Sequence, residues 1–317
     1  TRKMALDKGG ESPRLLVTGA NGVLGWNLCR LATQTWQTFG TVHRHPVVPA
    51  GVHACPVDLT DERSVTDLFT ATKPDAVVHA AALSSPDYCQ DHPAESEAVN
   101  VVASQLVASL CARARIPCVF TSSDLVFDGE HPPYDETHPT NPLSLYGEQK
   151  VRAEEAMRRC YPETTICRLP LMFGAGSPAS QGFFARMLQT MREGKEVPLF
   201  VDEMRTPVST ETASHGLILA LTKLRGMTIH LGGGESISRW DLARLAAEVF
   251  AVRSPRLVRC HQRDVPSRAP RPRDVSLNSG RARGIGFLPQ TIRQQMHDLR
   301  DMMEGPQNAA ARREGCL

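Results

Sequence analysis

The chain has 317 residues, of which 22% are charged, and a formal net charge of +2. This length suffices for one large or two modest domains, and the small charge gives no reason to expect a nucleic acid or an acidic membrane surface as partner. No apolar run is long enough to span a bilayer, and the polar start TRKMALDKGGESPR lacks the core of a signal peptide. Nine cysteines without metal-ligand spacing favour reduced thiols in a cytoplasmic protein with no metal site.

Short apolar runs alternate with helical patterns through the first half of the chain. The runs that predict strands are RLLVT, GTVH, HACPV, DAVVHAAA, PCVFTSS and TTICRLP. Helical periodicity lies between them, at about 22–35, 61–72, 94–114 and 144–157. This alternation is typical of an α/β fold in which a Rossmann-type, doubly wound parallel sheet is covered on both faces.

The pattern loosens after Gly174, where helices are predicted at 183–192, 212–224 and 238–252 between Pro- and Arg-rich segments. We interpret this part as a smaller, mostly helical C-terminal lobe that caps the sheet. The predicted organisation is a disordered tail over 1–13, a NAD(P)-binding Rossmann domain over 14–170, a substrate-binding lobe over 171–304, and a disordered tail over 305–317. An interleaving of the two domains stays open.

A glycine-rich turn, VTGANGVLG, connects the first strand to the first helix. Glycines at this place permit a tight turn and a close approach of the backbone to a pyrophosphate at the helix N-terminus. A glycine turn without a ligand is the simpler alternative, but strand, glycines and helix occur in the order that dinucleotide binding requires. The predicted cofactor-binding residues of this turn are Gly19, Asn21, Gly22, Val23, Leu24 and Gly25.

The second predicted strand ends in His43 and Arg44, where an acidic residue commonly holds the ribose 2′-hydroxyl of NAD. An arginine there can pair with a 2′-phosphate, so we expect NADP(H), with NAD(H) as the alternative. A solvated basic turn is an equally weighted interpretation. Asp58 and Leu59 follow the third strand and are expected near the adenine end of the cofactor, although Asp58 could instead cap the next helix.

Two polar groups of residues lie where catalysis is expected. Ser122, Ser123 and Asp124 end the fifth strand, and ligands of such sheets bind at the carboxyl ends of the strands. Tyr146 and Lys150 are one helical turn apart, and an ammonium beside a phenol lowers the pKa of the phenol. A Ser/Asp turn and a solvated helix face are the alternatives for these two motifs.

In combination, the chain resembles the extended short-chain dehydrogenase/reductases over about residues 14–290. The segments that carry the resemblance occur in the family's order: TGANGVLG, HAAA, AVN, SSDLVFDG, YGEQK and RLPLMFG. SSDLVFDG, RTPVS and RPRDVSLNSGRARGIGF are most similar to dTDP-4-dehydrorhamnose reductases. They are equally similar to the non-catalytic regulatory beta subunit of methionine adenosyltransferase.

The resemblance implies a role for each matching residue. Tyr146 would donate a proton to a substrate carbonyl, Ser123 would hydrogen-bond that carbonyl, and Asp124 would assist the proton path. Lys150 would bind the nicotinamide ribose. The further cofactor contacts that the resemblance implies are His79, Ala80, Ala81, Asn100 and Leu169, with Pro170 beside them; for Asn100, a polar residue satisfied inside the helix is an equal alternative.

The expected function is reduction of a keto group on a nucleotide-activated deoxysugar. Its expected substrate-binding residues are Ser84, Ser85, Ser123, Arg205, Arg271 and Arg273. The three arginines are included because guanidiniums clamp diphosphates. An arginine-rich surface loop is the alternative for the three arginines. A homodimer, a regulatory role and an epimerase or dehydratase stay open. Leu125 stands where the reductases usually carry tyrosine, and dehydratases usually carry glutamate there.

Overall fold

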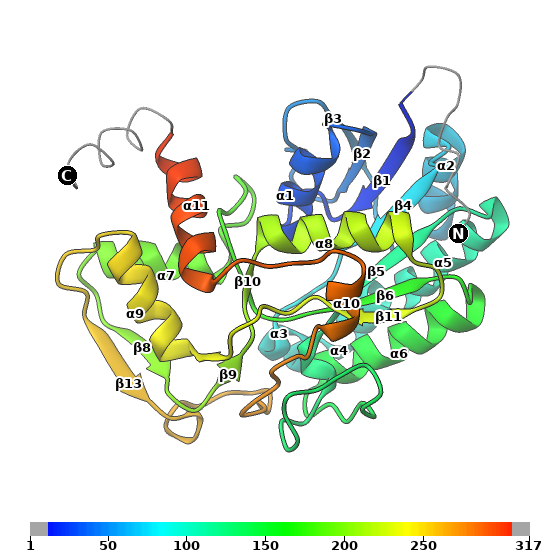
Figure 1. The fold of residues 1–317 in the computed structure, drawn as a ribbon. Helices are drawn as coiled ribbons and strands as arrows, with labels where there is room; N and C mark the ends of the chain where they lie inside the picture. The colour runs from blue at the N-terminus through cyan, green and yellow to red at the C-terminus, as the bar shows by residue number, and fades with distance from the viewer. Residues whose placement is uncertain (1–11, 306–317) are drawn as a thin grey trace.

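The computed structural model describes residues 12–305, so the two expected tails lie almost entirely outside the described range. Its centre is a parallel sheet of seven strands in the order β11-β6-β5-β4-β1-β2-β3 (Figure 1). This topology confirms the predicted α/β, Rossmann-type fold. The strands are β1 (Arg14–Thr18), β2 (Gln37–Val42), β3 (Val52–Pro56), β4 (Ala76–His79), β5 (Cys118–Ser123), β6 (Thr165–Leu169) and β11 (Thr228–His230).

Helices cover both faces of the sheet. On one face, α1 (Val23–Ala32) packs beside α8 (Thr210–Lys223), and Leu15 and Val17 point into the core that these helices close. Leu16 points into the core on the opposite face, beneath α2 (Glu62–Thr72), α5 (Ala103–Ala114) and α6 (Leu145–Cys160). Burial on both faces explains why the strands read as continuous apolar runs.

The helical segment predicted at 94–114 is interrupted. It begins within α4 (Pro93–Glu97), passes through a π-helical turn at Ala98–Val102 and continues as α5; a further short helix, α3 (Pro86–Asp91), precedes it. Turns of this kind insert one residue into a helix and often occur at functional sites. Asn100 lies within this turn.

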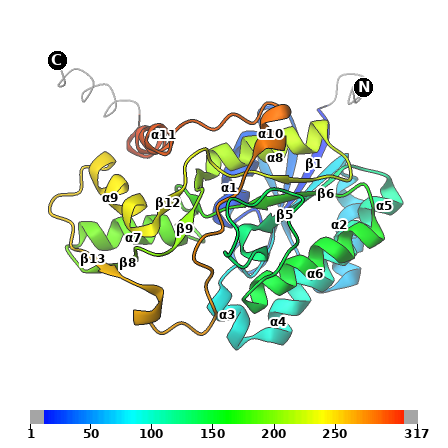
Figure 2. The ribbon, with the colours of Figure 1, turned by 60° about the horizontal axis from the view of Figure 1, so that its bottom comes forward.

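The C-terminal lobe lies beside the sheet (Figures 1 and 2). Its helices α7 (Gly182–Arg192), α9 (Arg239–Val249) and α11 (Ile292–Glu304) share an apolar core that includes Phe184, Leu242 and Met296. Three two-stranded pairs complete it: β7 (Met172–Phe173) with β10 (Val208–Ser209), β8 (Val197–Phe200) with β13 (Leu257–Cys260), and β9 (Met204–Arg205) with β12 (Ile237–Ser238).

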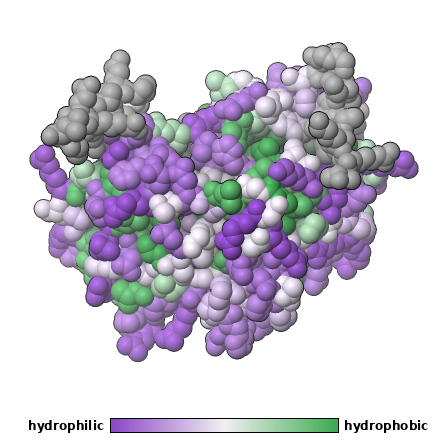
Figure 3. Space-filling model, viewed as in Figure 1, coloured by the Kyte–Doolittle hydropathy of each residue, from purple (hydrophilic) through white to green (hydrophobic). Residues whose placement is uncertain are grey.

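The chain passes between lobe and sheet more than once. After β10 it returns to the sheet as α8 and β11, and α10 (Gly280–Gly284) packs against β11. The surface seen in Figure 3 is mostly hydrophilic, with small apolar patches. Within residues 12–305, no helix combines the length and apolar content that crossing a membrane requires.

Candidate active site

A cleft of about 670 Å³ lies between the carboxyl edge of the sheet and the C-terminal lobe. The sheet side contributes the glycine turn after β1, the segment after β4, the end of β5 and the end of β6. The lobe contributes residues from α7, β9, α9 and the segment 270–272. Ligands of open parallel sheets bind at this edge, so the cleft is the candidate active site.

The glycine turn forms one wall of the cleft. Gly19 has a φ of +73°, which favours glycine, and its carbonyl accepts a hydrogen bond of 3.0 Å from the Gly22 N–H. A Cβ atom on Gly25 would lie 2.1 Å from the Gly19 oxygen, so this position excludes any larger residue. The turn brings the start of α1 to the cleft, as a pyrophosphate site requires. Gly22, Val23 and Leu24 also line the cleft, whereas the Asn21 side chain donates to the His45 carbonyl.

The end of β4 is tied to the end of β1. The Thr18 hydroxyl accepts the N–H groups of Ala80 and Ala81, each at 3.1 Å, and lies 2.7 Å from Nδ1 of His79. The second ring nitrogen of His79 lies 2.9 Å from the Ser104 hydroxyl, and the side chain is fully buried. Ala80 reaches the cleft. Neither His79 nor Ala81 lines the cleft, and both ring nitrogens of His79 already have partners within the protein. The cofactor contacts expected of these two residues therefore stay predictions.

Ser123, Tyr146 and Lys150 converge on the cleft as the sequence predicts. Ser123 ends β5 and lies beside Tyr146, which belongs to the first turn of α6. Ser144 caps this helix by accepting a hydrogen bond from the Gly147 N–H, and the first turn that follows places Tyr146 in the lining of the cleft. The Lys150 ammonium donates to the Thr121 carbonyl at 2.9 Å and lies 5.8 Å from the centre of the Tyr146 ring.

Burial dominates the titration of these groups. It lowers the pKa of Lys150 to about 8, so the ammonium still carries most of its charge near neutrality. Burial, followed by the charge of Asp124, raises the pKa of Tyr146 above its ordinary value. The pKa of this phenol therefore moves opposite to the expected direction, because burial outweighs any effect of the ammonium.

Asp124 is the buried acid of the site. One carboxylate oxygen, Oδ1, accepts a hydrogen bond of 3.1 Å from the Ser123 hydroxyl, while Oδ2 has no hydrogen-bond partner. Burial raises the pKa of Asp124 to about 6, against the opposing effect of Arg205. A carboxyl group with this pKa gains and loses a proton near physiological pH, as an acid in a proton path must.

Ser122 faces away from the reacting groups. Its hydroxyl donates to Glu154 at 2.5 Å, and Glu154 forms a buried ion pair of 2.8 Å with Arg168. Because side chains of a strand alternate between faces, Ser122 and Ser123 cannot both point toward one ligand. Ser122 lines the cleft as expected, but its hydroxyl is directed to Glu154 and not to a ligand.

Asn100 organises the loop after β4. Its amide oxygen accepts the Leu83 N–H at 2.9 Å, and its amide nitrogen donates to the Leu83 carbonyl and to Gln149 on α6. These bonds satisfy the side chain internally, as the alternative interpretation expected. Leu169 and Pro170, at the end of β6, line the cleft, so their expected place beside a nicotinamide is open to a ligand.

The residues expected to choose the cofactor lie at the exposed ends of β2 and β3. Two hydrogen bonds from Thr60 lower the pKa of Asp58, with a smaller contribution from the charge of His43, so His43 and Asp58 lie near one another. Asp61, not Asp58, caps α2. Arg44 is exposed, and Leu59 is half-buried beside Asp58. None of these side chains lines the cleft itself, and their contact with a cofactor stays a prediction.

The expected substrate residues separate into two groups. Ser84, Ser85, Arg205 and Arg271 line the cleft, and Ser85 also caps α3. Arg273 is exposed and contributes its carbonyl, which accepts the Met204 N–H. Arg271 and Arg273 therefore have different surroundings, although they are only two positions apart.

Three charged residues of the cleft escaped the sequence analysis. Arg186 on α7, Glu203 before β9 and Arg239 at the start of α9 all line it. The Arg239 guanidinium lies 4.0 Å from the centre of the Phe183 ring, a cation–π contact. Glu203 stands two residues before Arg205 in the motif DEMRTPVS, which was the available signal.

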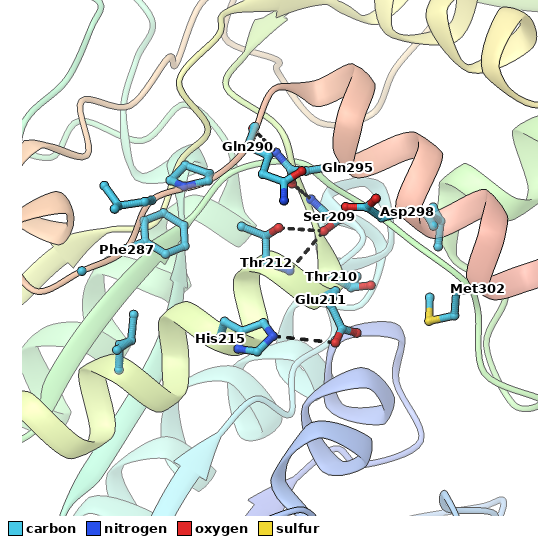
Figure 4. Close-up of a pocket in the computed structure, with 15 residues that line it drawn as sticks. Ser209, Thr210, Glu211, Thr212, His215, Phe287, Gln290, Gln295, Asp298 and Met302 are labelled. Atoms are coloured by element: carbon cyan, nitrogen blue, oxygen red, sulfur yellow. Dashed lines mark hydrogen bonds and ion pairs between the residues drawn. The ribbon is translucent and has the colours of Figure 1, made fainter. Parts of the chain in front are cut away.

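A second cavity, of about 620 Å³, opens between α8 and α11 (Figure 4). Its polar groups bond one another: Gln295 accepts the Ser209 N–H, and Glu211 pairs with Arg30 and lies 3.8 Å from His215. Leu219, Phe287, Leu299 and Met302 supply apolar lining. No sequence-predicted site residue lines this cavity.

The relatives of the chain include proteins described as a reductase and proteins described as a subunit of methionine adenosyltransferase. It is 30% identical over 282 residues to "Probable low-salt glycan biosynthesis reductase Agl14" of Haloferax volcanii, covering 87% of this chain and 93% of that protein. It is 26% identical over 283 residues to methionine adenosyltransferase 2 subunit beta of Danio rerio, covering 86% of this chain and 85% of the relative.

Solved structures share the fold. The dTDP-4-dehydrorhamnose reductase of Bacillus anthracis, solved in complex with NADP, superposes with a TM-score of 0.82 at 19% identity, covering 93% of this chain and all of that chain. The model of the RmlD substrate binding domain family matches residues 13–304, which span both the sheet and the lobe. The chain therefore belongs to the RmlD substrate binding domain family, within the extended short-chain dehydrogenase/reductases.

Proposed function

We propose that the protein is an NADPH-dependent reductase of a keto group on a nucleotide-activated deoxysugar. The observation that carries the proposal is the convergence of Ser123, Tyr146 and Lys150 at one end of a cleft whose wall is the glycine turn. A hydroxyl, a phenol and an ammonium in this order are what proton delivery to a carbonyl oxygen needs.

The residues present fit a dinucleotide. Gly19 and Gly25 leave no room for side chains within the turn, which keeps it tight, and the backbone at the start of α1 lines the cleft where a pyrophosphate would bind. Lys150 and Tyr146 lie further along the same cleft, where a nicotinamide ribose would be held. NADPH, when bound, supplies the hydride for reduction of the carbonyl carbon.

The side chains of the site supply the proton. Tyr146 donates it to the carbonyl oxygen while the Ser123 hydroxyl hydrogen-bonds the same oxygen. The Lys150 ammonium lies 5.8 Å from the centre of the Tyr146 ring, where it would hold the nicotinamide ribose. Asp124, hydrogen-bonded to Ser123, lies close enough to return a proton through the serine hydroxyl.

The lobe side of the cleft supports an anionic substrate. Arg186 is exposed, and no carboxylate within residues 12–305 forms an ion pair with it. Arg271 also lines the cleft and pairs with Asp87 at 3.2 Å. Guanidiniums at a cleft bind diphosphates with directed hydrogen bonds, which favours a nucleoside diphosphate sugar over a neutral ketone.

A regulatory subunit is the second candidate function. The observation that favours it is the similarity to methionine adenosyltransferase 2 subunit beta over most of both chains. In that case the cleft would bind a dinucleotide without turnover, and the protein would bind a second protein chain. An intact Ser123, Tyr146 and Lys150 favour the enzyme.

The test is reduction of a panel of nucleotide-activated 4-keto sugars, measured as the rate of NADPH oxidation. Tyr146→Phe should lower turnover by about two to four orders of magnitude, the usual contribution of a positioned general acid. NADPH affinity, measured by fluorescence titration, should change little because the phenol ring is kept. Turnover of Tyr146→Phe at the wild-type rate would refute the proposed proton donor. Tight binding of a partner chain without turnover of any ketone would favour the regulatory subunit.

A further inference from the structure

A line of four charges, three of them buried, crosses from the catalytic end of the sheet to the C-terminal lobe. Asp124, Arg205 and Glu203 are buried, and the fourth side chain, Arg239, is 20% exposed. Nε of Arg205 lies 3.5 Å from Oδ2 of Asp124, and Nη2 of Arg205 lies 3.4 Å from Oε1 of Glu203. Nη1 of Arg239 lies 3.9 Å from the same glutamate oxygen. Acidic and basic groups alternate along this line, so their formal charges cancel.

Arg205 is held firmly within the protein. Its side chain is only 6% exposed, and Nη1 donates to the Met204 carbonyl at 2.7 Å and to the Pro272 carbonyl at 3.5 Å. Two carboxylates and two carbonyls already surround the guanidinium. A guanidinium in this state has little capacity for a diphosphate, so its expected role as a clamp does not follow from its place in the cleft.

Asp124, in contrast, depends on Arg205. Apart from the hydrogen bond from Ser123 to Oδ1, the carboxylate has no hydrogen-bonded side chain in the described part of the chain, and its Oδ2 atom faces the guanidinium. A buried carboxylate without a cation would be strongly disfavoured in its charged form. The cation that offsets this cost comes from the lobe, 81 positions further along the chain.

We infer that Arg205, held from behind by Glu203, is a positioning residue that sets the charge and orientation of the Asp124 carboxylate beside Ser123 and Tyr146. The inference rests on the proposed reductase, in which Asp124 assists the proton path. It assigns the lobe a part in the chemistry besides substrate binding, because β9 carries the arginine that the end of β5 requires.

The groups that face Asp124 come from every neighbouring element. Ser123 precedes Asp124 on β5, and Tyr146 faces it from α6. From the lobe, Arg205 on β9 and Glu203 just before β9 face it, and the charge of Arg239 reaches it from α9. Arg205 lowers the pKa of Asp124, whereas Glu203 raises it. Removing the Arg205 charge should therefore raise the pKa of Asp124, and removing the Glu203 charge should lower it.

The experiment measures the titration of Asp124 by ¹³C NMR in full-length protein labelled at its aspartate carboxyl carbons, with Asp124→Asn to identify the signal. Arg205→Met should raise the midpoint by about one pH unit or more, because an adjacent arginine lowers a carboxyl pKa by about that much. Glu203→Gln, which keeps the shape of the side chain, should lower it. Arg205→Lys should restore most of the wild-type midpoint, and Arg63→Met, on the exposed face of α2, should leave it unchanged.

A second readout is the pH profile of kcat for NADPH oxidation with the nucleotide sugar. The break near pH 6 should move with the NMR midpoint in each variant. An Asp124 midpoint that stays fixed in both Arg205→Met and Glu203→Gln would overturn the inference. So would an Arg205→Met variant with a higher KM for the sugar and an unchanged midpoint, since that result describes a clamp.

The two readouts separate this inference from the proposed function. NMR midpoints that move in opposite directions, in a protein that reduces no ketone, would support the role of Arg205 and contradict the reductase. Thermal unfolding identifies a variant that fails to fold. Should Arg205→Met be one, Glu203→Gln decides the matter, because its Asp124 midpoint should still fall.

Discussion

Arg44 is an exposed side chain on which we expect the choice of cofactor to depend. It lies at the end of β2, and its charge opposes the rise in the pKa of Tyr88 that the hydrogen bond to Glu95 causes. The position where a carboxylate would repel a 2′-phosphate carries a cation instead. Exposure weakens such a pair, so we expect a modest preference for NADPH over NADH.

The expected preference is about tenfold, the lower end for a charge-assisted hydrogen bond. Arg44→Asp should abolish or reverse it, because the substitution removes an attraction and adds a repulsion. Fluorescence titration of both cofactors into wild type and variant measures the effect. Equal affinities of the wild type for NADPH and NADH would show that Arg44 does not reach the cofactor.

At this scale the sequence identified the residues whose motifs are local. Tyr146 and Lys150 are one turn apart, so their shared helix face follows from helical geometry alone. The partnership of Asp124 with Arg205 could not be foreseen, because it joins segments that are distant in the chain and no spacing rule connects them. The burial that raises the pKa of Tyr146 also depends on tertiary packing.

The turn between β1 and α1 is the element that the cofactor site needs most. Gly25→Ala would place a Cβ atom 2.1 Å from the Gly19 oxygen, a distance that real structures do not show. The backbone must therefore move, and we expect loss of NADPH binding together with a lower midpoint of thermal unfolding. Gly234→Ala is the matched control, because nothing lies within 4 Å of its Cβ position. Undiminished NADPH binding by Gly25→Ala would contradict the proposed cradle.

Long, strongly patterned elements were predicted well, and short ones were missed. The helices expected at 183–192, 212–224 and 238–252 correspond to α7, α8 and α9, because each carries a clear apolar face. β11 has only three residues, Thr228–His230, which is too short for an alternation of apolar and polar residues to be recognised in the sequence. The break before α5 was also missed, since a π-turn keeps the apolar character of the helix around it.

The interleaved path of the chain makes the two predicted domains depend on each other. The core beneath α1 contains Leu217 and Leu221 from α8 and Ile229 from β11, all of which follow the predicted boundary at residue 170. Burial of each such side chain contributes about 1.5–3 kcal/mol. We therefore propose that residues 12–170 do not form an independent folding unit.

A fragment of residues 12–170 should show no cooperative thermal transition by circular dichroism and little protection of β6 amides from hydrogen exchange. A fragment of residues 12–305 is the control and should unfold in one transition. Cooperative unfolding of the shorter fragment would show that the predicted Rossmann domain is autonomous.

The late position of β11 in the chain also has a consequence during synthesis on the ribosome. β6 leaves the ribosome as the edge of an unfinished sheet and finds its last neighbour only after Thr228 has been made. At about 5–20 residues per second, this interval is on the order of seconds. For that time an unpaired parallel edge and an apolar face are open to other chains, so a chaperone that shields nascent strands should raise the yield of this protein.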